Sequence, residues 1–448
     1  MNRQSGSFTR TMLSIAIPVA LQNLLFSSFT LIDTMMIGVL GDVPLAAVGM
    51  AGKWTWFFTI VLYGMTSGAS VFIAQYFGAG DRPGIHRSYG LLSVVSLAVS
   101  LLFMVSAVAV PELIVSIFTR DAEVIAIASV YLRIIALSYP FQALSKTGGT
   151  LLQSTQKVAI PFIAAACSVA TNVVLNALLI FGLCGFPALG AAGAAIASAI
   201  AGVVNAAVIY GAGFAQRTYL RAPLSALLAF DGSFVRSFVR VSAPAMFNET
   251  IWALGNLGYN AVFGRISTEA YAAMTVVKSI EDLTTIAIWG LGSSCAVMIG
   301  SYIGRGEIEK AKDCGRRHLA LTAGLSLFIG VSVILLRRPI MSLFGVSDTV
   351  RSMATVLLII YGLEAVPRNI PYMLVCGIFR SGGDTRYGLI VDMFSLYLIG
   401  LPLTAFVGLG LHMSVPFTYI VMYLVEDIFK CVVYGRHFFS NKWIKPVV

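Results

Sequence analysis

Two carboxylates, Asp33 and Glu249, lie in long apolar stretches of this sequence, and neither has a basic residue within two helical turns on its own segment. An ionisable side chain at membrane depth costs roughly 2.5 to 3.5 kcal/mol on insertion scales, so it needs neutralisation or a function. Burial favours the neutral acid and a nearby cation favours the carboxylate. A carboxyl group that alternates between dry and wet states can therefore exchange a proton or another cation. We predict this role for Asp33 and Glu249, with interhelical hydrogen bonding as the alternative.

Other acidic residues in apolar segments have basic partners at helical spacing. Groups three or four positions apart share one face of a helix and can form an ion pair there. The groups with this spacing are Lys278 with Glu281 and Asp282, Glu364 with Arg368, and Glu426 with Lys430. We expect these pairs to be structural.

Asparagine side chains accompany both lone acids. Asn172 and Asn176 are four positions apart and share a helical face, Asn256 follows Glu249 by two turns, and Asn369 lies in a later apolar segment. Hard cations prefer oxygen ligands, so amide carbonyls can complete a shell that one carboxylate begins. The pattern allows a sodium site near Glu249 or Asp33. Asparagine also joins transmembrane helices through ordinary hydrogen bonds, and this alternative remains open for each of these residues.

Each lone acid shares its segment with a proline: Pro18 precedes Asp33, and Pro244 precedes Glu249. Proline removes a backbone hydrogen bond and bends a helix. We predict that both segments bend and thereby change the exposure of the two carboxylates. The alternative is that the prolines only shape the bundle.

The elements that must position these residues are transmembrane helices. Hydrophobic residues make up 58% of the chain and charged residues 11%, whereas soluble domains carry roughly 25% charged residues. The apolar runs are continuous, unlike the alternating runs of transmembrane barrels. We predict an all-α integral membrane protein with twelve spans, each near the length that a bilayer requires. They lie at about 11–40, 45–75, 88–110, 123–147, 159–183, 190–212, 237–264, 270–303, 319–336, 350–378, 389–408 and 415–436.

The two halves of the sequence resemble each other without gaps. Phe8, Arg10, Pro18, Gly38, Gly78, Gly80 and Phe118 align with Phe234, Arg236, Pro244, Gly264, Gly304, Gly306 and Phe344. Six spans return the chain to its starting side, so the two repeats must enter the membrane in parallel. We predict a first lobe at 1–215, a cytoplasmic linker at 216–236 and a second lobe at 237–448.

Basic residues collect in alternate connections, which sets the orientation by the positive-inside rule. One set of connections holds only Arg120, Arg265, Arg337, Arg338 and Arg351. The other set holds Arg82, Arg87, Lys157, Arg217, Arg221, Arg236, Arg240, Arg305, Lys310, Lys312, Arg316, Arg317, Arg380, Arg386, Arg436, Lys442 and Lys445. We predict that the second set and both termini are cytoplasmic. The net charge of +10 is then a topology signal, and no nucleic-acid partner is expected.

No catalytic apparatus is visible in the sequence. It contains neither H-E-x-x-H nor G-x-S-x-G, and its six cysteines show no C-x-x-C spacing. The glycine-containing stretch 49–53 is too short for a P-loop and precedes Trp54, where serine or threonine is needed. We predict a protein that is not an enzyme and has no cofactor.

The order of motifs along the chain resembles the multidrug and toxic compound extrusion (MATE) family, in particular its bacterial NorM-like branch. The matching motifs are Pro18 with the D-T-x-x-x-G pattern at 33–38, the Q-Y-F-G-A-G-D turn at 75–81, I-G-R-G-E at 303–307 and F-R-S-G-G-D-T at 379–385. The resemblance implies a V-shaped carrier with two lobes. This chain has Asn176 where many members carry aspartate, and Asn369 where the sodium-coupled branch carries an acid.

The resemblance implies a secondary antiporter that exports organic, often cationic drugs or toxic metabolites in exchange for H⁺ or Na⁺ by alternating access. It further implies a multi-pass protein of the plasma (inner) membrane that contacts lipids, and we expect a monomer. The alternative from the same superfamily is a lipid-linked saccharide flippase. A flippase needs basic groups for pyrophosphate, and the bases in apolar segments are Lys53, Arg133, Lys146 and Lys278.

Overall fold

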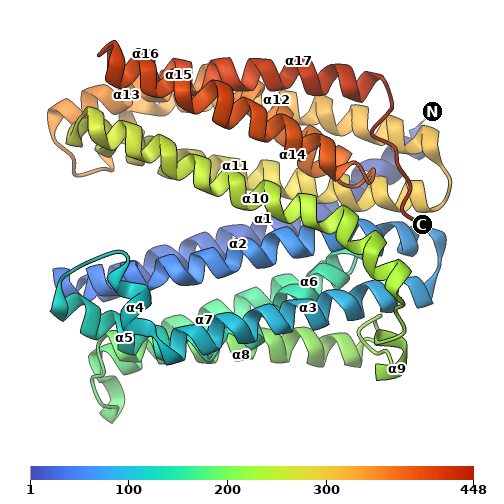
Figure 1. The fold of residues 1–448 in the computed structure, drawn as a ribbon, viewed down its shortest axis with the longest axis horizontal. Coiled ribbons are helices and arrows are strands. Elements are labelled where there is room, and N and C mark those ends of the chain that lie inside the picture. The colour runs from blue at the N-terminus through green and yellow to red at the C-terminus, as the bar shows by residue number, and fades with distance from the viewer. Residues whose placement is uncertain (1) are drawn as a thin grey trace. The chain divides into compact units, whose positions relative to one another are not determined.

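The computed structural model describes residues 2–448, with side chains from Phe8 onward, and the described chain is built from helices (Figure 1). Within residues 2–448 the only β-pairing is an isolated bridge between Gly383 and Ile444. The prediction of an all-α protein is confirmed.

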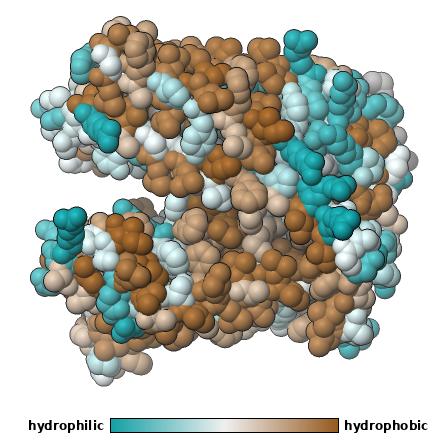
Figure 2. Space-filling model, viewed as in Figure 1, coloured by the Kyte–Doolittle hydropathy of each residue, from teal (hydrophilic) through white to brown (hydrophobic). Residues whose placement is uncertain are grey.

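Each of the twelve predicted spans lies in helical chain, and nine of the described helices are long and apolar enough to cross a membrane. The number is ten if the bent pair α5 (Ala122–Ala136) and α6 (Tyr139–Ser154) forms one span. The other two predicted spans fall in α10 (Gly232–Ile266) and in the run from α16 (Val415–Ile420) to α17 (Glu426–Phe439). Both of these segments carry polar side chains that belong to the sites described below. Figure 2 shows hydrophobic residues over much of the visible face and hydrophilic residues toward the helix ends.

The described chain forms two compact units. The first-repeat unit comprises Leu21–Ile73 and Gly80–Val239, and the second-repeat unit comprises Ala74–Ala79 and Arg240–Val448 together with the chain up to Ala20. The unit boundaries therefore cross α1 (Asn2–Gly38), α2 (Asp42–Ala79) and α10 within their lengths.

The first-repeat unit is a helical bundle in which α7 lies against α8, as Figure 1 shows in green. Besides parts of α1 and α2, α5 and α6, it contains α3 (Arg82–Ala109), α4 (Pro111–Ser116), α7 (Ala159–Phe181), η1 (Leu183–Gly185), α8 (Ala191–Ala215) and α9 (Leu224–Leu227). The start of α10 also belongs to this unit, and the predicted linker at 216–236 contains α9 and the first residues of α10.

In the second-repeat unit α13 packs against α11, α12 and α17. Besides most of α10, α16 and α17, this unit contains α11 (Thr268–Gly304), α12 (Ile308–Ser342), α13 (Asp348–Tyr372), η2 (Met373–Phe379), α14 (Thr385–Met393), η3 (Phe394–Gly400), α15 (Leu401–Ala405), η4 (Phe406–Gly410) and η5 (Val421–Val425). The segments η2 to η5 are π-helical turns inserted in longer helices.

Local sequence explains several helix boundaries. Asp81 caps α3, because its carboxylate accepts a hydrogen bond from the Gly84 N–H at 3.0 Å. Asp231 precedes α10, and the hydrogen bond from the Phe234 N–H, at 3.0 Å, holds the pKa of its carboxyl below the ordinary value. The predicted span at 123–147 is wrong as one helix, because it bends by 48° between α5 and α6, and Pro140 lies in the first turn of α6.

Helices α2 and α11 approach closely within the second-repeat unit. A Cβ atom added to Gly78 would overlap the backbone of Ser301, and one added to Gly304 would overlap the backbone of Gln75. Only glycine permits this approach of the two backbones.

The C-terminal residues are anchored to the second-repeat unit. Trp443 is fully buried, and its indole N–H donates to the Phe438 carbonyl at 3.2 Å. Gln75 accepts a hydrogen bond from the Val447 N–H at 2.9 Å and donates to the Ser381 carbonyl at 3.0 Å. The tail is therefore part of the folded unit.

Replacing Trp443 with alanine is expected to destabilise the protein by about 3 to 5 kcal/mol, because it removes a fully buried aromatic side chain. Unfolding of the purified protein in detergent micelles measures the change. Trp56, 47% exposed, is the control, and Trp56→Ala should stay within about 0.5 kcal/mol. Equal effects of the two substitutions would show that the tail is not anchored by Trp443.

Candidate functional site

Asp33 in α1 is joined to the predicted asparagine pair of α7. Asn176 donates from Nδ2 to Asp33 Oδ1 at 2.7 Å and to Asn172 Oδ1 at 2.9 Å, and Asn172 donates to the Ser198 hydroxyl of α8 at 3.0 Å. Both asparagines are fully buried. One chain of hydrogen bonds thus crosses three helices of the first-repeat unit, from Asp33 in α1 through the two asparagines of α7 to Ser198 in α8.

This chain leaves one buried acceptor unused. Asn176 Oδ1 has no hydrogen-bond partner among the described residues, although it is buried beside the Asp33 carboxylate. An unpaired buried carbonyl is costly, and a proton donor or a cation would satisfy it. The donor set, one carboxylate and neutral amide oxygens, suits a single positive charge. Residues 2–448 contain no group of three His, Cys, Asp or Glu residues arranged to hold a metal ion.

The second lone acid, Glu249, has a basic partner from another helix. Arg380 directly follows the π-helical turn η2, is 3% exposed, and contacts Glu249 Oε1 through Nη1 at 2.6 Å. Its Nη2 donates to Asn248 Oδ1 at 2.6 Å. The expectation that Glu249 lacks a basic partner is therefore wrong, because the partner comes from a distant part of the chain. Arg380, assigned above to a cytoplasmic connection, lies in the turn after η2 and is a buried member of this ion pair.

A polar network continues from Arg380 through the second-repeat unit. Asn248 donates from Nδ2 to Asp392 Oδ2 at 2.8 Å, and Lys430 contacts Asp392 Oδ1 at 3.2 Å. Lys430 also contacts Glu426 Oε1 at 2.5 Å, which confirms the pair predicted from their spacing. The Tyr259 hydroxyl donates to Glu426 Oε2 at 2.5 Å.

Two predicted site residues are not brought to Glu249 by any hydrogen bond. Asn256 donates to the Trp252 carbonyl and Asn369 to the Ala365 carbonyl, each at 2.8 Å and each one turn back on its own helix. Arg380 contacts Glu249 instead, and Asp392 contacts Asn248, the residue that precedes Glu249 in the chain. Sequence spacing gave no signal for either, since they are far from Glu249 in the chain.

Helices α1 and α10 run continuously through Pro18 and Pro244. The unit boundaries fall close to both prolines, at Ala20–Leu21 in α1 and at Val239–Arg240 in α10. The bending role of the two prolines stays a prediction.

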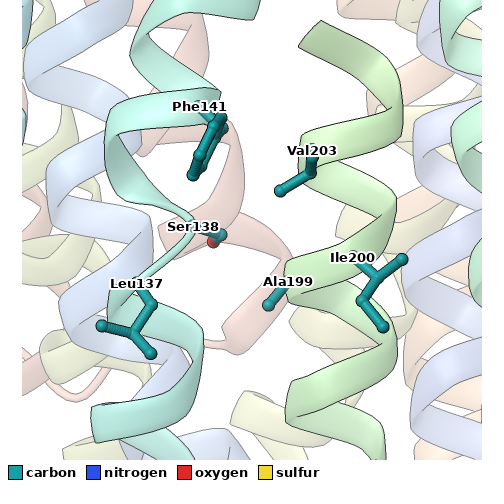
Figure 3. A pocket seen from close by; sticks show the side chains of 6 residues that line it. All are labelled: Leu137, Ser138, Phe141, Ala199, Ile200 and Val203. Carbon is teal, nitrogen blue, oxygen red and sulfur yellow. The ribbon is translucent and has the colours of Figure 1, made fainter. Parts of the chain in front are cut away.

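An apolar pocket of about 240 Å³ lies where α5 and α6 meet, opposite α8 (Figure 3). Leu137, Ser138 and Phe141 line one side, and the other side consists of Ala199, Ile200 and Val203. The Ser138 hydroxyl is used internally, since it donates to the Ile135 carbonyl at 2.6 Å. The pocket has no charged lining residue, so it suits only apolar ligands or apolar parts of ligands.

Comparison with known proteins gives the family. The profile of the MatE family matches residues 18–178 and 244–406, one match in each repeat. A probable multidrug resistance protein NorM of Thermotoga maritima is 23% identical over 441 residues, covering 98% of this chain and 94% of that protein. A protein with the same description from Deinococcus radiodurans is 28% identical over 427 residues, covering 90% and 89%.

The fold is also found among solved structures. A mutant of the Vibrio cholerae MATE transporter VcmN superposes with a TM-score of 0.89 at 20% identity, covering 98% of this chain and 99% of that chain. Two family matches that together span most of the chain fit the repeat seen in its sequence and its multi-pass helical structure. This chain belongs to the MatE family and is a membrane transporter, not an enzyme.

Proposed function

We propose that this protein is a secondary antiporter that exports organic, often cationic compounds in exchange for an inward-moving cation, H⁺ or Na⁺. The descriptions of its NorM relatives support multidrug export as the kind of cargo. The observation that carries the proposal is the Asp33 carboxylate, hydrogen-bonded to Asn176, whose buried Oδ1 has no partner. We further propose a bacterial inner-membrane location with both termini in the cytoplasm, following the distribution of basic residues.

The coupling site is assigned to the first-repeat unit. Binding of a proton or sodium ion beside Asp33 neutralises the carboxylate and gives the Asn176 carbonyl a partner, so the occupied site is better suited to a dry environment than the empty one. A cargo cation that interacts with the same carboxylate competes with the coupling ion. If the cargo cation and the coupling ion cannot occupy the Asp33 carboxylate together, alternating access exchanges one for the other across the membrane.

The groups around Asp33 and around Glu249 differ in how well they could bind a sodium ion. Arg380 contacts Glu249 at 2.6 Å and already neutralises it, so a sodium ion there would face a guanidinium at close range. Asn256 and Asn369, the amide ligands predicted for such a site, bond to their own helices. Sodium is therefore proposed only near Asp33, and Glu249 is proposed to organise the second-repeat unit through Arg380.

For a neutral cargo the membrane potential supplies enough free energy for export, whereas a one-for-one exchange of two cations moves no net charge and is driven by the ion gradient. Moving one elementary charge inward is worth about 2.3 kcal/mol per 100 mV. One charge per cycle therefore supports roughly fiftyfold accumulation of a neutral cargo at that potential.

Transport by the purified protein in lipid vesicles tests the proposal. Sodium and proton gradients are imposed separately, and uptake of a fluorescent organic cation into the vesicles is followed. We expect uptake against the cargo gradient under at least one of the two ion gradients. Uptake that is equal with and without both gradients would contradict antiport.

The flippase alternative is tested in the same vesicles with a fluorescent lipid-linked saccharide. The four bases that motivated this alternative share no contact partner among the described residues. Arg133 pairs with Glu112 at 2.8 Å, Lys278 with Asp282 at 2.9 Å, and Lys53 lies over the Phe118 ring. Movement of the lipid-linked saccharide without export of the organic cation would replace the antiporter proposal.

A further inference from the structure

Glu364 in α13 is a buried carboxyl group without a hydrogen bond. The residue is 4% exposed, and neither Oε1 nor Oε2 has a partner among the described residues. Its spacing predicted an ion pair with Arg368, one turn later on the same helix, and this prediction is wrong.

Arg368 is occupied by other groups. Its Nη2 lies 2.5 Å from Glu281 Oε1, and its Nε donates to the same oxygen at 2.6 Å. Its Nη1 lies 3.7 Å from Asp427 Oδ2, and its guanidinium lies 3.7 Å from the centroid of the Tyr423 ring. Arg368 thus places two donors on one carboxylate oxygen of Glu281 and also contacts a second acid and an aromatic face, so this cation is committed away from Glu364.

The surroundings of Glu364 contain more negative than positive groups. The charged groups that act on it are Arg368 from its own helix, Asp427 from α17 and Glu281 from α11, and none lies on α12. Tyr419 in α16 and Tyr423 in η5 are also close enough to interact electrostatically with Glu364.

Two other bases act on the neighbouring acids, and neither neutralises the excess. Lys430, whose charge acts on Asp427, contacts Asp392 and Glu426. Lys278 lies 3.5 Å from Glu281 and is shared with the exposed Asp282, at 2.9 Å. An ionised Glu364 would then be a third buried carboxylate around one guanidinium, without any donor. A buried carboxylate in that position takes up a proton and becomes neutral.

We propose that Glu364 is a second proton-binding site, separate from Asp33, whose affinity is set by sharing Arg368 with Glu281. Glu364 holds a proton while Arg368 is bound to Glu281. When Arg368 turns to Glu364, the Glu364 O–H bond breaks and the proton passes to Glu281, which has lost its guanidinium. Arg368 contacts one carboxylate and one acid is protonated in either arrangement, so the proton is conserved. This inference concerns proton binding and does not depend on the export activity.

Infrared spectroscopy of the full-length protein tests the site directly, because a protonated carboxyl group has a C=O stretching band that a carboxylate lacks. The protein is measured at pH 7 in a detergent without carbonyl groups, since lipid esters absorb nearby. We expect Glu364→Gln to remove the intensity of one protonated carboxyl group. Glu269→Gln is the matched control, an exposed glutamate at the start of α11, and should leave the band unchanged. A band that Glu364→Gln does not reduce would overturn the proposal.

A second variant tests the shared arginine. Glu281→Gln removes the competing carboxylate, so Arg368 is free to bind Glu364, which should ionise and lose the same band. An unchanged band in Glu281→Gln would contradict the sharing. This variant also decides the question if Glu364→Gln does not yield folded protein.

Replacing sodium by choline in the buffer shows whether Glu364 binds a proton or a sodium ion. The band should be the same in both salts, whereas its loss on adding sodium would show that Glu364 binds sodium instead of a proton. Transport is measured separately in vesicles. A protein that shows the band but does not export organic cations would overturn the proposed function and leave Glu364 as a proton site.

Discussion

Asp33→Asn is expected to abolish ion-coupled export while the protein remains folded. Asparagine has the size of aspartate and can still bond to Asn176, but it can neither bind a proton nor balance a cation. In a one-for-one exchange, a tenfold gradient of the coupling ion supports about tenfold accumulation of a singly charged cargo cation. Asp33→Asn removes this drive, so accumulation in vesicles should fall from about tenfold towards equality across the membrane. Vesicles with an imposed tenfold sodium or proton gradient and a fluorescent organic cation provide the measurement.

The control for this variant is Asp42→Asn, which removes an exposed acid from the first turn of α2 in the same unit. It should export like the parent protein, because Asp42 lies outside the Asp33 site. If Asp33→Asn also exports at the parent rate under sodium and proton gradients, the coupling ion does not bind at Asp33.

Arg380→Met is expected to destabilise the protein by about 3 kcal/mol, because it leaves the Glu249 carboxylate, 16% exposed, largely buried without its cation. Asn248 loses the guanidinium donor at the same time. The free energy of unfolding in detergent micelles measures the effect. The double variant with Glu249→Gln should recover most of the loss, because no unpaired charge then remains.

An exposed ion pair provides the matched control. Arg351 contacts Asp348 at 3.0 Å, with side chains 44% and 97% exposed, so Arg351→Met should cost less than about 1 kcal/mol. A loss in Arg380→Met that the second substitution does not recover would mean that Arg380 stabilises the unit through contacts other than Glu249.

Interactions within one helix were predictable from the sequence. The i to i+4 pair of Glu426 and Lys430 forms at 2.5 Å, and Lys278 lies 3.5 Å from Glu281 and 2.9 Å from Asp282. The apolar runs likewise predicted the helices, because their length is set by the bilayer. The bend between α5 and α6 was missed although Pro140 marks it.

Interactions between helices were not predictable in the same way. The spacing rule failed for Glu364, because Arg368 binds Glu281, 87 positions away, in preference to the acid on its own helix. Asp33 and Asn176 are separated by 143 positions. Both were recognised as site residues, but their contact depends on how α1 packs against α7, which one sequence does not specify.

The buried acidic side chains of the second-repeat unit are not all neutralised by buried basic side chains. Among its described and largely buried side chains, the carboxylates outnumber the cations Arg368, Arg380 and Lys430. These carboxylates are Glu249, Glu281, Glu364, Asp384, Asp392, Glu426 and Asp427. The excess supports the proposal that at least one of these acids carries a proton.

The close approach of α2 and α11 has an internal symmetry. Gly78 meets Ser301, and Gly304 meets Gln75. In the alignment of the two repeats Gly78 corresponds to Gly304 and Gln75 to Ser301, so the two contacts are the same contact made twice. Reciprocal contacts of this kind define an isologous interface, such as the two-fold interface of a homodimer. At this contact α2 and α11 are therefore related as the two copies of one helix in such an interface.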